Sequence, residues 1–119
     1  MLGDITIAEE IYLATGYTDM RKSIDGLAAI VQQRFRLDPF QPALFLFCGK
    51  HCDRIKALLW EGDGFILLYK RLDAGAFSWP RSTAEMASIT SEQYRLLMSG
   101  FSIVARHPIK EVPTPKEIA

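Results

Sequence analysis

The sequence predicts an α+β fold, in which a small antiparallel sheet packs against one long helix in the N-terminal half and a short helix follows near the C-terminus. The long helix is indicated by apolar residues that recur every three or four positions between Met20 and Leu37. The sheet is indicated by three short apolar runs separated by turn-forming segments. Such runs with tight connections favour a three-stranded antiparallel meander, to which we expect one or two short strands to be added.

The length and composition are typical of one globular domain. We therefore expect the 119 residues to form a single unit, with 1–9 and 105–119 as flexible or extended ends. A hydrophobic content of 49% excludes a disordered chain, and no run approaches the roughly 18 apolar residues of a membrane span. The first residues are acidic and mixed, unlike a secretory signal, so we expect a cytoplasmic protein.

The N-terminal elements follow from local signals. EIYLAT, which begins at Glu10, has the β-branched and aromatic residues of a short strand, and Gly16 interrupts it. The long helix is expected over 20–37. It should end at Asp38, because a residue that precedes proline is disfavoured in helical geometry.

The meander strands are expected at 43–48, 54–60 and 65–70. In the middle strand Ile55, Ala57 and Leu59 alternate with Arg54 and Lys56, so one face should be apolar and the other basic at its start. A further short strand is expected at 77–79, before a proline.

The C-terminal helix is predicted by a capping box. Thr90 is followed three residues later by Gln93, and Gly100 provides a stop. We therefore expect a helix from about Ser91 to Ser99.

The segment Cys48-Gly49-Lys50-His51-Cys52 suggests metal or redox chemistry. Its CxxxC spacing, however, differs from the CxxC of zinc and redox pairs, and His107 is the one other histidine of the chain. We therefore expect no metal and no cofactor. The preferred interpretation is a turn between two strands, whose cations Lys50, Arg54 and Lys56 can meet a phosphate backbone.

The acidic residues suggest a metal-dependent nuclease as an alternative. A two-metal carboxylate cluster could draw on Asp19, Asp25, Asp53, Glu61, Asp63 and Asp73. Of these, Asp53, Asp63 and Asp73 lie in or beside predicted turns, where aspartate is common because its side chain bonds to nearby backbone amides. The chain also lacks a phosphate-binding loop, a nucleophile elbow and a zinc-protease motif, so we expect no catalytic residue and no enzyme activity.

Basic and aromatic residues give the remaining candidates. The net charge is zero, so any attraction to nucleic acid has to come from a local basic face. The candidates for nucleic-acid binding are Arg21, Lys22, Lys50, Arg54, Lys56, Lys70 and Arg71. Phe77, Trp79 and Arg81 are candidates for binding a partner protein. Because Phe77 and Trp79 are two positions apart and would share one sheet face, packing in the core is the alternative for them.

Several ordered motifs resemble a known family. GYTDMRKSIDGLAAIV, DPF and LFLFCGKHCDRIKALLWEGDGFILLYKRLDAGAFSWP closely resemble the TnpB accessory proteins of bacterial insertion sequences of the sixty-six family, which are distinct from the RNA-guided nuclease of the same name. The resemblance runs from about Ile11 to Gly100. It implies an accessory role in DNA transposition beside a separate transposase that carries the catalytic acids, and it implies no catalytic residue in this chain.

Two hypotheses follow from the residues and the resemblance. In the first, the protein is noncatalytic and helps assemble the transposase–DNA complex through a basic surface. In the second, it is an adaptor that binds or stabilises the transposase without contacting DNA. Expected partners are the transposase, other proteins of the same element and DNA, with no membrane and no small-molecule substrate. If the cations converge on one face, the first hypothesis is favoured. If they scatter and pair with Asp19, Asp25 and Asp73, the second is favoured.

Overall fold

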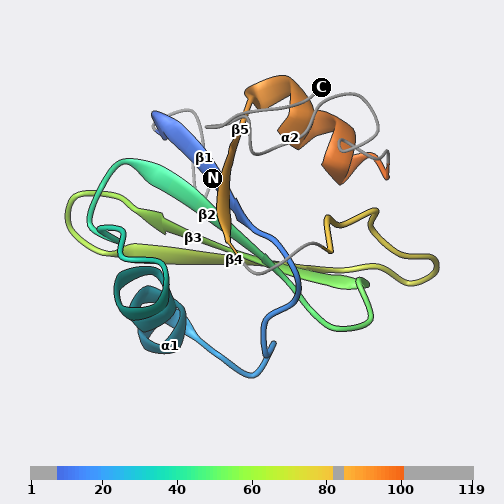
Figure 1. Cartoon of the computed structure of the whole chain (residues 1–119), viewed down its shortest axis with the longest axis horizontal. Helices are drawn as coiled ribbons and strands as arrows, with labels where there is room; N and C mark the ends of the chain where they lie inside the picture. Colours follow the sequence, from blue (N-terminus) through green and yellow to red (C-terminus); the bar gives the residue numbers. More distant parts are fainter. Residues whose placement is uncertain (1–7, 82–84, 101–119) are drawn as a thin grey trace.

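The computed structural model describes residues 8–81 and 85–100 and shows a five-stranded sheet with helices on both faces (Figure 1). The strand order is β4-β3-β2-β1-β5. The elements are β1 (Glu10–Ala14), α1 (Ile24–Ala29), the π-helix η2 (Ile30–Arg34), β2 (Ala43–Cys48), β3 (Arg54–Trp60), β4 (Phe65–Arg71), β5 (Met86–Ile89) and α2 (Ser91–Met98). The α+β class is therefore confirmed.

The sheet is mixed, which corrects the antiparallel prediction. Strands β2, β3 and β4 form the expected meander, with both neighbouring pairs antiparallel. β1, however, runs parallel to β2, with Glu10 opposite Ala43 and Leu13 opposite Leu46. Parallel neighbours need a crossover connection, and the helix between β1 and β2 provides it.

The N-terminal helix is shorter than predicted. It spans α1 and η2, from Ile24 to Arg34, so Arg21 and Lys22 precede it. The preceding segment is held instead against the end of the sheet, where the N–H of Thr18 donates to the carbonyl of Cys48 at 2.7 Å. At the other end the N–H of Phe35 donates to the carbonyl of Ile30, five residues back, and Arg36 has a left-handed φ of 59°. The helix therefore ends before the residue that precedes proline.

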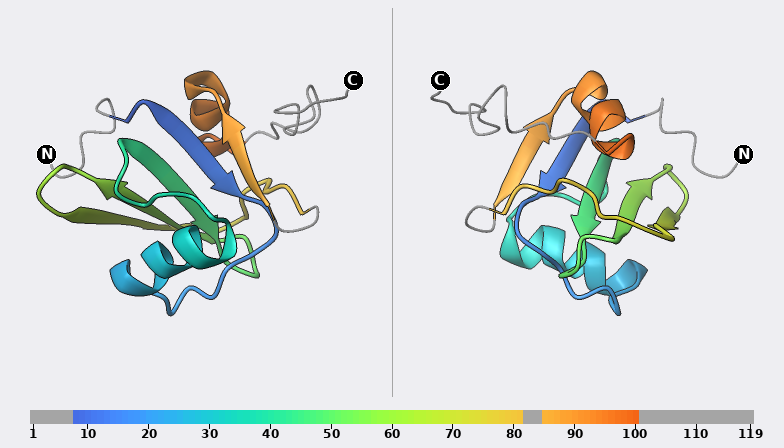
Figure 2. Two further views of the ribbon diagram at one scale, coloured as in Figure 1. Left: turned by 60° about the vertical axis from the view of Figure 1, so that its left-hand side comes forward. Right: turned by 90° about the vertical axis from the view of Figure 1, so that its right-hand side faces the viewer.

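Each face of the sheet carries its own core. On the α1 face Leu27 and Val31 of the helical segment pack against Phe45, Phe47 and Leu58 of the sheet. On the opposite face α2 contributes the fully buried Leu97. The two helices cover opposite faces, as Figure 2 shows.

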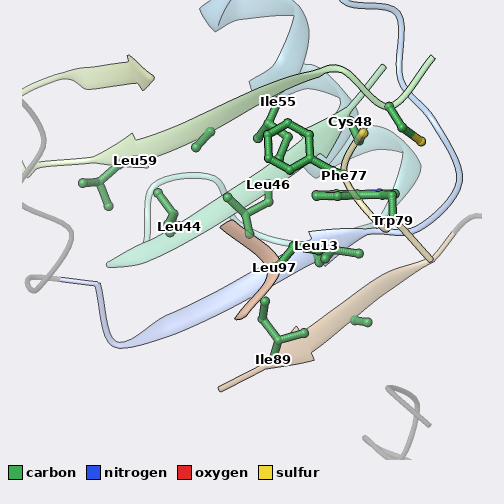
Figure 3. Close-up of a cluster of buried hydrophobic side chains, with 13 residues drawn as sticks. Leu13, Leu44, Leu46, Cys48, Ile55, Leu59, Phe77, Trp79, Ile89 and Leu97 are labelled. Carbon is green, nitrogen blue, oxygen red and sulfur yellow. The ribbon is translucent and has the colours of Figure 1, made fainter. Parts of the chain in front are cut away.

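Residues 77–79 form no strand, contrary to the prediction. Phe77 and Trp79 lie over the α2 face, beside Leu46 and Ile55 (Figure 3). The indole N–H of Trp79 donates to the carbonyl of Ala14 at 2.9 Å, which fixes the ring over β1. The additional edge strand is β5, which pairs antiparallel with β1.

The C-terminal helix and its capping box are as predicted. The Thr90 hydroxyl accepts from the N–H of Gln93 at 3.0 Å, and the Gln93 side chain accepts from the N–H of Thr90 at 2.8 Å. Gly100, with φ 93°, follows the helix. Residues 101–119 lie outside the described residues, so the expectations for the tail and for His107 stay predictions. No helix of the described segments is long and apolar enough to span a membrane.

Candidate nucleic-acid interface

The pairing of β3 with β4 decides which face each strand cation occupies. Arg54 lies directly opposite Arg71, and Lys56 opposite Tyr69. Residues two apart on a strand share a face, so these side chains lie on the same face as Leu58, which belongs to the core beneath α1. Lys70 lies on the opposite face, with its Nζ 5.9 Å from the centroid of the Phe77 ring. Three of the four predicted strand cations therefore converge, and Lys70 does not join them.

Lys56 ties the segment before α1 to the sheet. Its Nζ donates to the backbone carbonyl of Lys22 at 2.7 Å and lies 5.6 Å from the centroid of the Tyr69 ring. Lys22 is thereby brought beside the strand cations, although it is 34 residues away in the chain. Lys56 is half-buried, and these two contacts hold its ammonium group in place.

Arg21, another predicted cation, is already paired. Its guanidinium donates to both carboxylate oxygens of Asp19, at 3.0 and 2.8 Å. The side-chain hydrogen bond from Arg21, together with the backbone N–H of the same residue, lowers the pKa of Asp19 to about 2. Asp19 therefore stays ionised and offsets the charge of Arg21 at physiological pH. Because the pair is exposed, it adds little to stability.

A groove of about 480 Å³ lies between this segment, the helix and the turn that joins β2 to β3. We call it the basic groove, after the four cations that line it: Lys22, Arg34, Lys50 and Arg54. The remaining lining residues are Tyr17, Thr18, Asp19, Met20, Ile30, Gly49, His51 and Asp53. Arg34 was not selected from the sequence, because its position beside the turn between β2 and β3 depends on how the helix packs against the sheet.

The turn between β2 and β3 is braced by Arg81. Cys48 and Cys52 are buried free thiols. Burial is the main cause that raises the pKa of Cys48, and the neighbouring Cys52 raises it further. The Arg81 guanidinium donates to the carbonyl of Lys50 at 3.0 Å and to the Cys52 sulfur at 2.9 Å. Arg81, predicted to contact a partner, thus holds the turn that carries Lys50. Among the residues that the structure describes, no three His, Cys, Asp or Glu side chains are grouped to hold a metal ion.

Two aspartates of the nuclease alternative, Asp53 and Asp63, lie at opposite ends of one strand. Asp53 directly precedes β3, and Asp63 lies in the turn that follows it. The seven residues of β3 hold them roughly 20 Å apart at about 3.3 Å per residue. Two catalytic metal ions require ligands around centres only about 4 Å apart. These two aspartates therefore do not form a common metal site.

The predicted partner surface at Phe77 and Trp79 has to be corrected. Their side chains are 4% and 5% exposed and belong to the core on the α2 face, which is the alternative considered for them. A partly exposed group of rings lies elsewhere, at the Trp60 end of β3. Phe40, Trp60 and Phe65 have ring centroids 4.9 to 5.2 Å apart, and Phe40 is 54% exposed. We call this group the aromatic cluster; DPF and WEGDGF contain its residues, but their proximity depends on the fold.

Comparison with known proteins identifies relatives along most of the chain. A family model described as "IS66 Orf2 like protein" matches residues 9–108. The uncharacterized protein y4jC of Sinorhizobium fredii (strain NBRC 101917 / NGR234) is 34% identical over 102 residues, which cover 84% of this chain and 87% of the relative. The uncharacterized protein y4hO of the same strain is 39% identical over 98 residues, covering 82% and 84%. No solved structure matches the chain.

Proposed function

Since the chain belongs to the IS66 Orf2-like family, we propose that it is a noncatalytic accessory protein of transposition that helps assemble the transposase–DNA complex through the basic groove. Family membership makes it a transposition-associated accessory protein, and the family is not a known catalytic one. The proposed contact is between groove cations and DNA phosphates.

The convergence of cations from separate segments carries this proposal. Lys22 precedes the helix, Arg34 ends it, and Lys50 and Arg54 come from the turn and from β3. Two carboxylates, of Asp19 and Asp53, line the same groove, so the cations are in excess. In a chain with a net charge of zero, this excess is local.

The pairing of Arg54 with Arg71 adds a physical argument. Like charges directly opposite each other on neighbouring strands destabilise a sheet. A bound phosphate would relieve this repulsion, because its oxygens accept hydrogen bonds from guanidinium groups. The Asp53 carboxylate, 3.8 Å from the Nε of Arg54, offsets part of this repulsion, and a bound phosphate would offset more of it.

The test compares two double variants with the same change of charge. Lys50→Gln with Arg54→Gln removes two cations from the groove, whereas Lys70→Gln with Arg95→Gln removes two exposed cations assigned to the opposite face and to α2. Each protein is titrated with duplex DNA from the element end at several salt concentrations. We expect the groove variant to bind duplex DNA more weakly than the wild type. The slope of log K against log salt should be less steep by about 1.8, because each of the two lost phosphate contacts contributes about 0.9.

The control variant should bind duplex DNA like the wild type. Equal weakening of both variants would mean that the groove is not the contact surface. Absence of binding by the wild type, or binding that does not respond to salt, would contradict the proposal as a whole.

The aromatic cluster supports a second candidate function, an adaptor that binds the transposase. Phe40 is exposed and lies against Trp60 and Phe65, which form the apolar end of β3 and β4. Clustered exposed aromatic rings are typical of protein interfaces. β4 also lies at one edge of the described sheet, where a partner strand can be added. The two functions are compatible, because the surfaces occupy opposite ends of β3.

A further inference from the structure

Two exposed tyrosines accompany the cations of the proposed interface. Tyr17 lines the basic groove and is 54% exposed, and Tyr69 on β4 is 53% exposed. Large aromatic side chains are normally buried to a greater extent in a domain of this size. Their exposure beside cations therefore needs an explanation.

The backbone on both sides of Tyr17 is anchored while its side chain is exposed. The N–H of Gly16 donates to the carbonyl of Pro80 at 2.9 Å, and the N–H of Thr18 donates to the carbonyl of Cys48 at 2.7 Å. The Arg81 guanidinium carbon lies 5.9 Å from the centroid of the Tyr17 ring, and Arg81 is itself held by the carbonyl of Lys50. The ring is thus presented at the edge of the groove in a fixed position.

Tyr69 is positioned in a similar way on the α1 face of the sheet. It lies opposite Lys56, whose Nζ is 5.6 Å from the ring centroid. Two residues further along β4, Arg71 faces Arg54, and the Arg54 side chain lines the basic groove. The surface therefore runs from one tyrosine through a set of cations to the other.

Aromatic rings that alternate with cations suit unpaired nucleotides. A base stacks on an aromatic ring only if its own face is free, and in a duplex the neighbouring base pairs cover these faces. The phosphates of the same strand meet the cations. We propose that the basic groove binds single-stranded DNA, with Tyr17 and Tyr69 stacking on its bases; this rests on the proposed function, because the same cations contact the phosphates.

The test measures the affinity for one DNA sequence in single-stranded and duplex form. A labelled oligonucleotide of about 16 nucleotides, within the range of known single-strand sites, is titrated by fluorescence anisotropy at low salt. We expect the wild type to bind the single strand more tightly than the duplex. Tyr17→Ala should weaken single-strand binding about 5- to 150-fold, and Tyr69→Ala should act in the same direction, with duplex binding unchanged.

Two further variants control for the ring and for folding. Tyr17→Phe keeps the ring and should keep single-strand affinity. Phe40→Ala removes an equally exposed ring of the aromatic cluster, outside the groove, and should change neither affinity. Unchanged duplex binding by Tyr17→Ala also shows that this variant is folded.

The outcomes separate this inference from the proposed function. Equal affinity of the wild type for the two forms of DNA overturns the stacking role and leaves the phosphate contact in place. If Tyr17→Ala loses affinity equally for single-stranded and duplex DNA, the stacking role is likewise overturned. If the wild type binds neither form, both the inference and the proposed function are wrong.

Discussion

Among single residues, Asp19 lowers the positive charge of the proposed interface. Its carboxylate lines the basic groove and is hydrogen-bonded to the guanidinium of Arg21. Asp19→Asn removes one negative charge and releases Arg21 from its ion pair. We therefore expect this variant to bind DNA more tightly, with a dependence of log K on log salt that is steeper by about 0.7 to 0.9 if Arg21 gains a phosphate contact. Salt titrations of wild type and variant measure both quantities.

The low pKa of Asp19 explains why a substitution, and not a change of pH, is needed to test its effect on DNA binding. The hydrogen bonds from Arg21 hold that pKa at about 2, against an ordinary value of 3.8. The contribution of the pair to stability is thus present above pH 3.8 and is lost as the pH falls towards 2. Across physiological pH the carboxylate stays charged. Asp63→Asn, in the turn beyond β3, is the control, and an equal gain of affinity there would argue against a local effect of Asp19.

Sequence reasoning located several of these residues but did not determine which of them pair. Lys22, Lys50 and Arg54 were selected from the sequence, and all three line the groove. Adjacent residues of a strand point to opposite faces of the sheet, so Lys70 and Arg71 cannot lie on the same face. This alternation can be read from the sequence alone. The bond between Arg21 and Asp19 depends on the conformation of an irregular segment, which periodicity does not describe.

At the level of secondary-structure elements, α2 depends on its capping box. The Thr90 hydroxyl satisfies the N–H of Gln93, and the helix brings the fully buried Leu97 onto the sheet. Thr90→Ala leaves this N–H without its side-chain partner. We expect the free energy of unfolding to fall by about 1 kcal/mol, measured by urea denaturation. Ser91→Ala, at the first helical position, should change it much less, and a similar loss in both variants would show that the cap is not responsible.

Elements specified by neighbouring residues were predicted, and those specified by distant ones were not. The meander and the capped helix depend on short-range signals, and both are present in the structure. The parallel pairing of β1 with β2 and the addition of β5 at the edge join segments far apart in the chain. The helix length also depended on distant contacts, because the carbonyl of Lys22 accepts from the Nζ of Lys56 and the segment before Ile24 is thereby held against the sheet.

Across the whole molecule, β3 and β4 carry two different surfaces. Arg54 and Arg71 lie at one end of this pair of strands, and Trp60 and Phe65 at the other. The seven residues of β3 span roughly 20 Å at about 3.3 Å per residue, which exceeds the Debye length of about 8 Å at physiological salt. Changes of charge at one end should therefore have little direct effect on contacts at the other.

This separation predicts variants that lose one function and keep the other. Phe40→Ala with Trp60→Ala should abolish copurification with the transposase in DNA-free buffer, because the exposed ring of Phe40 and the half-buried ring of Trp60 that it contacts are both removed. Salt-dependent DNA binding should stay unchanged. Lys50→Gln with Arg54→Gln should do the reverse. Circular dichroism checks that both variants are folded. Loss of transposase binding in the charge variant would show that one surface serves both partners. If the aromatic variant still binds the transposase, the aromatic cluster is not the adaptor site, and the basic groove is left as the supported interface.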